Sequence, residues 1–255
     1  MVIEWNKVTW YSKLLAVILF VLVFYIGFNL GEKKKEVISP PTKTEEQKVP
    51  PVPVTIKTKD IKEENFSGKV PVISGSGKLS LASQEYINQT VADFKKEADE
   101  QVPSMREQFG EESPTAQYEI DINAKYIEGG KTESVVMRVY TYTGGAHGNS
   151  SYKVITASAP AGGILSLADV VQTDKRAAFV EFVKKELKIW KSDEAGLFPE
   201  AVDALNFGSF ADWAFDKNNL ILFFDQYEIG AGVLGPVDFP IKIERINDFL
   251  NFTVL

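Results

Sequence analysis

An apolar run near the start of the chain, residues 14–30, restricts its organisation more than any other feature. The run LLAVILFVLVFYIGFNL contains no charged side chain, and 15 of its 17 residues are apolar. As a helix it would span about 26 Å, at the short end of what a hydrocarbon core of roughly 30 Å requires. Aromatic residues precede the run and three lysines follow it, as at membrane interfaces. The sequence therefore predicts a transmembrane anchor at 14–30 behind a cytoplasmic tail at 1–13.

Two alternatives to this anchor are a cleaved signal peptide and a buried core helix. The residues Asn29-Leu30-Gly31 make a poor signal-peptidase site, which favours an uncleaved anchor. Charge alone does not orient it, because two lysines lie just before the run and three just after it. The lack of cysteine fits an exported domain and excludes a lipoprotein anchor. We expect a single-pass protein of the cytoplasmic membrane with its C-terminal domain outside the cytoplasm.

A linker rich in Pro, Lys, Glu, Thr and Val follows the anchor, and we place it at residues 31–60. Its composition cannot bury a core. Five prolines favour an extended chain that would hold the next domain away from the membrane: Pro40, Pro41, Pro50, Pro51 and Pro53.

Composition then excludes several kinds of chemistry. With no cysteine and one histidine, the chain cannot build a cysteine-rich zinc site, a thiol nucleophile or a disulfide framework. The formal net charge of -7 disfavours a nucleic-acid partner, because phosphates require a basic surplus. We therefore expect no metal and no cofactor.

The remaining residues form two predicted subregions, 66–165 and 166–255. In the first, a strand within 66–82 precedes a helix capped by Ser83, which Pro103 ends or kinks. Alternating apolar residues and glycine-containing turns then predict strands at 118–126, 134–143, 152–157 and 164–171.

The second subregion begins with a helix capped by Asp174, whose apolar stripe runs from Phe179 to Trp190. Residues 207–215 and 220–224 predict a strand pair, and the last strand lies near 240–243. Strands and helices are segregated, so the predicted fold class is α+β, with an antiparallel sheet and two main helices after the N-terminal transmembrane helix.

His147 is the only histidine, and it lies in the glycine-rich segment 143–149 between two strands. Such a loop brings side chains to the surface through positive φ angles, and it equally suits a simple turn. Ser150 and Ser151 are nearby but do not form a nucleophile elbow. Asp225 with Glu228, or Glu111 with Glu112, could be read as a glycosidase pair, although solvated surface charges are the simpler interpretation. We expect no catalytic residue and no enzyme activity.

Two motifs resemble a known bacterial family. Residues 139–149 (VYTYTGGAHGN) are similar to the strand and loop of extracytoplasmic domains in lysozyme-sensing anti-sigma factors, and to the region preceding the catalytic domain of certain peptidoglycan deacetylases. Residues 222–229 (LFFDQYEI), followed by Gly235-Pro236 and 239–241, resemble the family's closing strands. The resemblance covers roughly 70–250. It departs at the loop 230–232, where the family pattern has a proline and an aromatic.

The resemblance implies an α+β ectodomain of two subregions that meet near residue 165, with a binding role at the cell envelope. It does not imply deacetylation, because nothing here resembles the separate metal-dependent catalytic domain. Nor does it imply sigma-factor control, because only 13 residues precede the predicted anchor. The ligand-binding candidates lie in or beside the two motifs: Tyr142, His147, Asn149, Tyr227 and Glu228.

Three functions follow as hypotheses. The first is a membrane-anchored module that captures lysozyme or a similar cationic wall protein, because the residues after 50 carry 21 basic and 30 acidic side chains, a formal charge of -9. The alternative is binding of peptidoglycan or another glycan through exposed tyrosines. A wall-active hydrolase that uses His147 is the third and least favoured.

Overall fold

The computed structural model describes residues 52–111, 113, 116–160, 162–190 and 196–251. The predicted anchor at 14–30 and the linker up to residue 51 lie outside these residues. Within the described part of the chain, no helix is both long and apolar enough to cross a membrane. The described residues belong to one compact unit that begins at residue 50.

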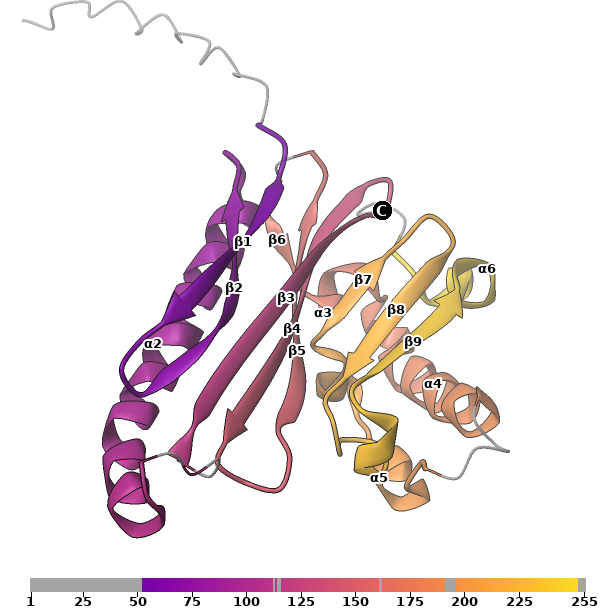
Figure 1. Cartoon of the computed structure of the whole chain (residues 1–255). Helices are drawn as coiled ribbons and strands as arrows, with labels where there is room; N and C mark the ends of the chain where they lie inside the picture. The colour runs from indigo at the N-terminus through magenta and orange to yellow at the C-terminus, as the bar shows by residue number, and fades with distance from the viewer. Residues whose placement is uncertain (1–51, 112, 114–115, 161, 191–195, 252–255) are drawn as a thin grey trace, which may run out of the picture. The chain divides into compact units, whose positions relative to one another are not determined.

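Six strands form the first sheet, and their spatial order follows the chain from β1 to β6. The strands are β1 Thr55–Lys62, β2 Phe66–Ser74, β3 Tyr118–Glu128, β4 Thr132–Thr143, β5 Asn149–Ser158 and β6 Ile164–Leu165. One long helix, α2 Lys78–Phe109, connects β2 to β3 and lies along one face of this sheet (Figure 1).

Three strands form the second sheet, in the order β7-β8-β9, and all its pairs are antiparallel. They are β7 Trp213–Phe215, β8 Asn219–Phe224 and β9 Val237–Lys242. Short helical segments and one longer helix surround them: α3 Leu167–Val170, η3 Thr173–Lys175, α4 Arg176–Trp190, α5 Pro199–Ala204, η4 Phe207–Phe210, η5 Gly232–Leu234, α6 Ile243–Ile246 and η6 Asn247–Phe249.

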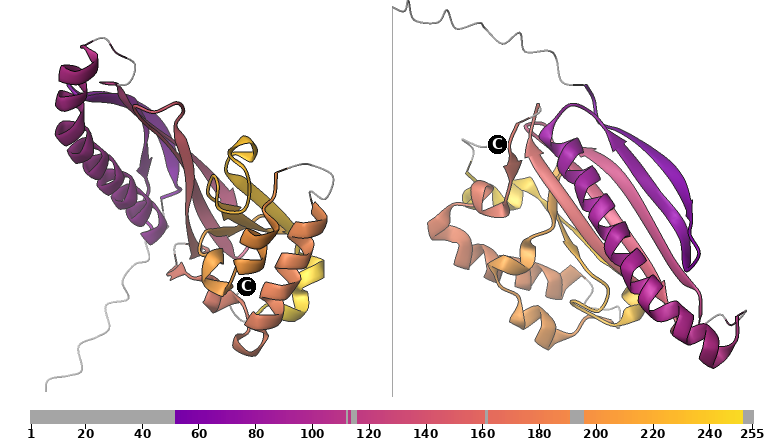
Figure 2. Two further views of the ribbon diagram at one scale, coloured as in Figure 1. Left: turned by 90° about the horizontal axis from the view of Figure 1, so that it is seen from below. Right: turned by 90° about the vertical axis from the view of Figure 1, so that its left-hand side faces the viewer.

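The elements form four layers, which are α2, the six-stranded sheet, the three-stranded sheet and α4 (Figures 1 and 2). Residues such as Ile120 and Met137 pack toward α2 in one core. Their sequence neighbours on the other face, including Val136, meet Phe223 of the second sheet in a smaller core. The opposite face of that second sheet packs against α4 through a third cluster. Because strand side chains alternate, each sheet buries residues on both faces where another layer covers it.

Strand β5 has an edge that no strand covers at its first residues, because β6 pairs only with Thr156 and Ala157. Side chains from the β8–β9 loop and from the segment before β7 bind this edge instead. The backbone N–H groups of Ser150, Tyr152 and Val154 donate to Gln226 Oε1 at 3.0 Å, Asp225 Oδ1 at 2.7 Å and Asp212 Oδ1 at 2.6 Å, respectively. Three consecutive outward-facing amides are thereby satisfied at the contact between the two sheets.

The α+β class is confirmed, but two details of the predicted sheet are wrong. The strands form two sheets, and β2 pairs parallel to β3 through Phe66↔Tyr118 and its neighbours. A helix as long as α2 between two neighbouring strands returns the chain to the same end of the sheet, which makes the pair parallel.

The predicted linker also ends too late, because residues 55–60 belong to strand β1. This strand pairs along its whole length with β2, from Thr55↔Ser74 to Lys62↔Ser67. Ile56 and Ile61 are half-buried and the other six residues of β1 are exposed. The strand therefore shows no apolar alternation that could mark it in the sequence. Charged side chains are typical of an edge strand, since they discourage pairing with another chain.

Helix α2 begins before the predicted cap and continues past the predicted break. Gly77 occupies the N-cap position, and Ser83 lies inside the helix, where it is fully buried. Pro103 also lies inside the helix. Pro103 has no N–H to donate to the backbone carbonyl of the exposed Asp99. The packing of Val102, which is fully buried against the sheet, outweighs this lost hydrogen bond.

The predicted strand at 164–171 is mostly helical. Only Ile164–Leu165 pairs as a strand, after which Ser166 and Asp169 form a capping box at the start of α3. Asp169 Oδ2 accepts hydrogen bonds from the Ser166 backbone N–H and Oγ, both at 2.7 Å, and these bonds lower the pKa of the Asp169 carboxyl. Local capping of this kind favours helix over strand.

Candidate functional site

Two loops from distant parts of the sequence meet at one end of the sheets. The loop 144–148 joins β4 to β5, and the segment 225–236 joins β8 to β9. Gly144 has a φ of 83°, which confirms that the glycine-rich loop uses the left-handed region. The Gln226 backbone N–H donates to the Ser150 carbonyl at 3.0 Å, and the Ser150 N–H donates to Gln226 Oε1 at 3.0 Å. These two bonds fix one loop against the other.

His147 is exposed and contacts both loops. Its Nδ1 lies 2.9 Å from the Gly148 carbonyl oxygen, and its Nε2 lies 3.2 Å from Tyr227 Oη. Because a carbonyl only accepts, the proton of the neutral ring lies on Nδ1 and the Tyr227 hydroxyl donates to Nε2. The two rings are tilted by 32° with centroids 6.2 Å apart. They form an exposed aromatic pair on one surface.

Tyr227 adopts an unusual backbone conformation. Its φ is 72°, and it is the one described non-glycine residue with a positive φ. The ring lies against Gly232, where an added Cβ would approach ring atoms to 2.4–2.6 Å, yet the side chain is still 47% exposed. A large residue rarely occupies this backbone region unless its surroundings hold it there. The two loops therefore present the Tyr227 ring to solvent in a fixed position.

Two tyrosines of β4 contact the loop 144–148. Tyr142 Oη donates to the Gly145 carbonyl at 2.9 Å. The Tyr140 ring occupies the space beside Gly148, where a Cβ would come within 2.4 Å of it. Sequence reasoning identified Tyr142 but missed Tyr140, although the two-residue spacing on one strand places both side chains on the same face.

The two remaining candidates do not join the His147–Tyr227 pair. Asn149 is the first residue of β5, it is exposed, and its side chain bonds to no described residue. The carboxylate of Glu228 accepts the Asp225 backbone N–H at 2.8 Å, which caps its own turn. Desolvation raises the pKa of Glu228, and the neighbouring charges of Asp225 and Asp212 raise it further.

Asp225 and Glu228, once considered as a glycosidase pair, have structural partners. Asp225 accepts from the Tyr152 amide and Glu228 from the Asp225 amide, so both side chains hold backbone groups at the sheet contact. Ser150 is buried at 3% exposure, and its Oγ lies 3.5 Å from an Arg138 nitrogen. Within the described residues, no group of three or more His, Asp and Glu side chains could hold a metal ion.

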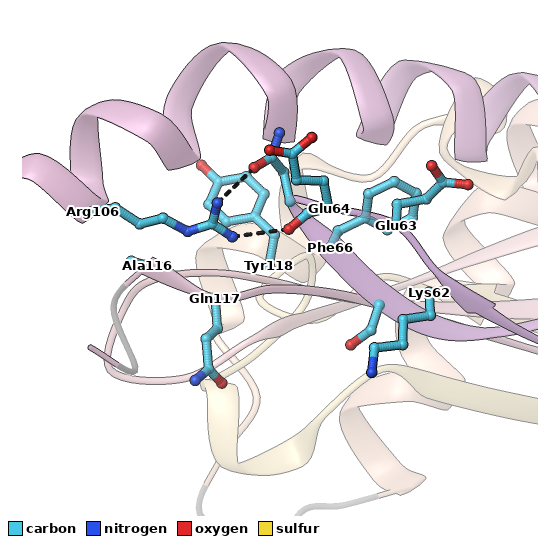
Figure 3. Close-up of a pocket in the computed structure, with 10 residues that line it drawn as sticks. Lys62, Glu63, Glu64, Phe66, Arg106, Ala116, Gln117 and Tyr118 are labelled. Carbon is cyan, nitrogen blue, oxygen red and sulfur yellow. Dashed lines mark hydrogen bonds between the residues drawn. The ribbon is translucent and has the colours of Figure 1, made fainter. Parts of the chain in front are cut away.

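A polar pocket of about 210 Å³ lies between the β1–β2 turn, the end of α2 and the start of β3 (Figure 3). Arg106 donates to Asn65 Oδ1 at 3.0 Å and to the Glu64 carbonyl at 2.9 Å, which ties the turn to the helix. Phe66 and Tyr118 are buried beside it. No sequence motif marked this pocket, because its residues come together only through the parallel pairing of β2 with β3.

Two family models match the chain in succession. Residues 57–150 match the family described as "Deacetylase PdaC". Residues 168–244 match the family described as "Protein of unknown function (DUF3298)". The first match covers most of the six-stranded sheet, and the second covers α4 and the three-stranded sheet.

A curated relative and two solved structures are similar to most of this chain. Peptidoglycan-N-acetylmuramic acid deacetylase PdaC of Bacillus subtilis (strain 168) is 26% identical over an alignment of 252 residues, which covers 96% of this chain and 51% of the relative. The chain thus spans about half the length of this curated relative.

The two solved structures are DUF3298 family proteins of Bacteroides fragilis and Pseudomonas aeruginosa. The first has a TM-score of 0.58 at 15% identity and covers 78% of this chain and 94% of its own. The second has a TM-score of 0.54 at 16% identity and covers 80% and 96%. At these identities the likeness shows a shared fold.

Proposed function

Because this chain belongs to the PdaC/DUF3298-like domain family, we propose that it is a peptidoglycan-associated binding module that acts by binding glycan at the His147–Tyr227 surface. The observation that carries the proposal is the meeting of two residues 80 positions apart, joined at 3.2 Å and both exposed. Tyrosine offers an apolar ring for the C–H face of a sugar and a hydroxyl for its polar edge. Histidine adds a polar ring beside it.

Binding without catalysis fits the surroundings of His147. A histidine base in nucleophilic catalysis is oriented by a third group and faces an activated nucleophile. Here the orienting partner is the Gly148 carbonyl, and the other nitrogen faces the Tyr227 hydroxyl. This arrangement holds the ring still and supports a role in recognition.

Tyr227→Ala is expected to weaken binding of the full chain, kept in detergent, to purified peptidoglycan by about tenfold. Alanine has the same difficulty with a positive φ as tyrosine, so the backbone requirement does not change. Depletion of the protein from solution by increasing amounts of peptidoglycan measures the effect. Tyr126→Ala is the matched control, because Tyr126 is 41% exposed but lies near the other end of β3.

Unchanged affinity in Tyr227→Ala would exclude this surface as the glycan site. A double-mutant cycle with His147→Ala sharpens the result. Since the two side chains share one hydrogen bond, their effects on binding should be less than additive. Equal melting temperatures of the variants would exclude unfolding as the cause.

We further propose that residues 14–30 anchor the module in the cytoplasmic membrane, with the described domain outside the cytoplasm. The support is the uncharged apolar run and the translocation of large domains with little regard to flanking charge. Protease added to intact cells should digest the C-terminal domain. Full protection of that domain would contradict the proposed orientation.

Capture of a cationic wall protein such as lysozyme is a second candidate function, favoured by the charge of -9 after residue 50. Attraction of this kind speeds encounter and weakens with salt. Titration of lysozyme onto the full chain at low and at physiological ionic strength tests it. Absence of binding at low ionic strength would exclude lysozyme as the partner.

A further inference from the structure

In-register pairing places a row of polar residues across four strands of the first sheet. Lys62 of β1 is opposite Ser67 of β2, Ser67 is opposite Glu119 of β3, and Glu119 is opposite Tyr142 of β4. Residues directly opposite each other share a face of the sheet. At about 4.8 Å per strand, the row extends for about 14 Å.

This row lies on the face of the sheet that α2 does not cover. Phe66, Tyr118 and Ile120 point toward α2, and the alternate residues therefore point the other way. Figure 1 shows the second sheet beside β3 to β5, whereas β1 and β2 lie on the far side of β3, away from the second sheet. Ser67 and Glu119 are accordingly exposed. The row begins at the polar pocket and ends at Tyr142, which braces the loop that carries His147.

Hydrogen-bond donors gather where the row begins. Lys62, Ser67 and Gln117 line the pocket. In Figure 3 the polar ends of Lys62 and Gln117 point away from α2, and the alternation of β2 places Ser67 on the same face. None of these three side chains bonds to another described residue. One end of the row, with Gln117 beside it, thus offers an ammonium, a hydroxyl and an amide, and the other end is Tyr142.

We propose that this row binds an extended glycan strand that carries free carboxylates, with one carboxylate received by Lys62, Ser67 and Gln117. The inference rests on the proposed glycan-binding function and specifies the class of glycan. A carboxylate accepts from all three donors and is paired in charge with Lys62. Glu119 is opposite Ser67, one strand spacing away, and lies two spacings, about 10 Å, from Lys62. The glycan carboxylate is therefore received on the Lys62 side of Ser67, where screening weakens repulsion by Glu119. Along the row the Glu119 carboxylate accepts sugar hydroxyls.

The test compares two oligosaccharides of equal length on the full chain in detergent. One alternates N-acetylglucosamine with peptide-free N-acetylmuramic acid, whose lactyl group bears a free carboxylate, and the other contains N-acetylglucosamine alone. The unaltered chain should bind the acidic oligomer about threefold to fivefold more tightly, as for a partly exposed ion pair. Lys62→Gln should abolish this preference.

Lys59→Gln is the matched control, because Lys59 is exposed on the same strand but pairs with Val70, whose side chain faces α2. It should keep the preference. A preference that is absent in the unaltered chain, or that persists in Lys62→Gln, overturns the proposed row while neutral glycan still binds at Tyr227. If neither oligomer binds, the glycan-binding function itself fails together with the row.

Discussion

Phe179→Ala is expected to reduce the free energy of unfolding by about 3–5 kcal/mol, the usual cost of emptying a buried phenylalanine site. Phe179 lies on α4, is fully buried, and contacts three other rings. Its ring centroid is 6.3 Å from that of Phe207, 6.0 Å from Phe210 and 5.7 Å from Phe249. Three rigid rings held by two separate segments, η4 and η6, cannot collapse into the space, so the cavity should persist.

Urea unfolding followed by circular dichroism measures this loss. Ile189→Ala is the control on the same helix, because Ile189 is 60% exposed and its truncation should change stability by no more than about 0.5 kcal/mol. Similar small losses for both variants would contradict the assignment of Phe179 to a tightly packed centre of the core.

Asp212→Ala should cost about 1–3 kcal/mol, because it leaves the Val154 amide without its acceptor. Asp212 Oδ1 accepts this N–H at 2.6 Å and lies 3.5 Å from Lys153 Nζ. Asp212→Asn keeps an oxygen at the same place and should cost less than the alanine variant. Urea unfolding of both variants measures the difference, and equal losses would show that the hydrogen bond contributes little.

Acidification should increase the contribution of Asp212 to stability. Burial raises the pKa of Asp212 above its ordinary value of 3.8, so the folded chain holds the proton more tightly than the unfolded chain does. Stability from this group is therefore gained as pH falls through the raised folded value toward 3.8, and it is absent at neutral pH. The stability of the unaltered chain relative to Asp212→Asn should rise between pH 7 and pH 4. A constant difference would contradict the raised pKa.

Regular apolar patterns made part of the fold predictable. The stripe from Phe179 to Leu187 identified α4, and the alternating residues on either side of Gly129-Gly130 identified β3 and β4. Strand β1 lacked such a pattern, because its stability comes from pairing with β2 and not from burial. The parallel pairing of β2 with β3 depends on contacts across α2, which local sequence does not reveal.

The candidate site was predictable to the extent that motifs marked its loops. The glycine-rich loop pointed to His147 and the second motif to Tyr227, and the structure joins them. Glu228 was chosen for its neighbours in sequence, but its carboxylate faces its own turn. The pocket at Lys62 depends on strand register, which becomes visible only when β1, β2 and β3 are aligned.

The second matched region supplies the side chains that bind the open edge of β5, so the two matched regions depend on each other in the folded chain. A chain cut after residue 165 would keep its six strands but lose Asp212, Asp225 and Gln226 together. Its amides at 150, 152 and 154 would then be open to a strand of another molecule, which is a route to self-association. The two regions match separate sequence families, yet the second covers the β5 edge of the first and thereby opposes its aggregation.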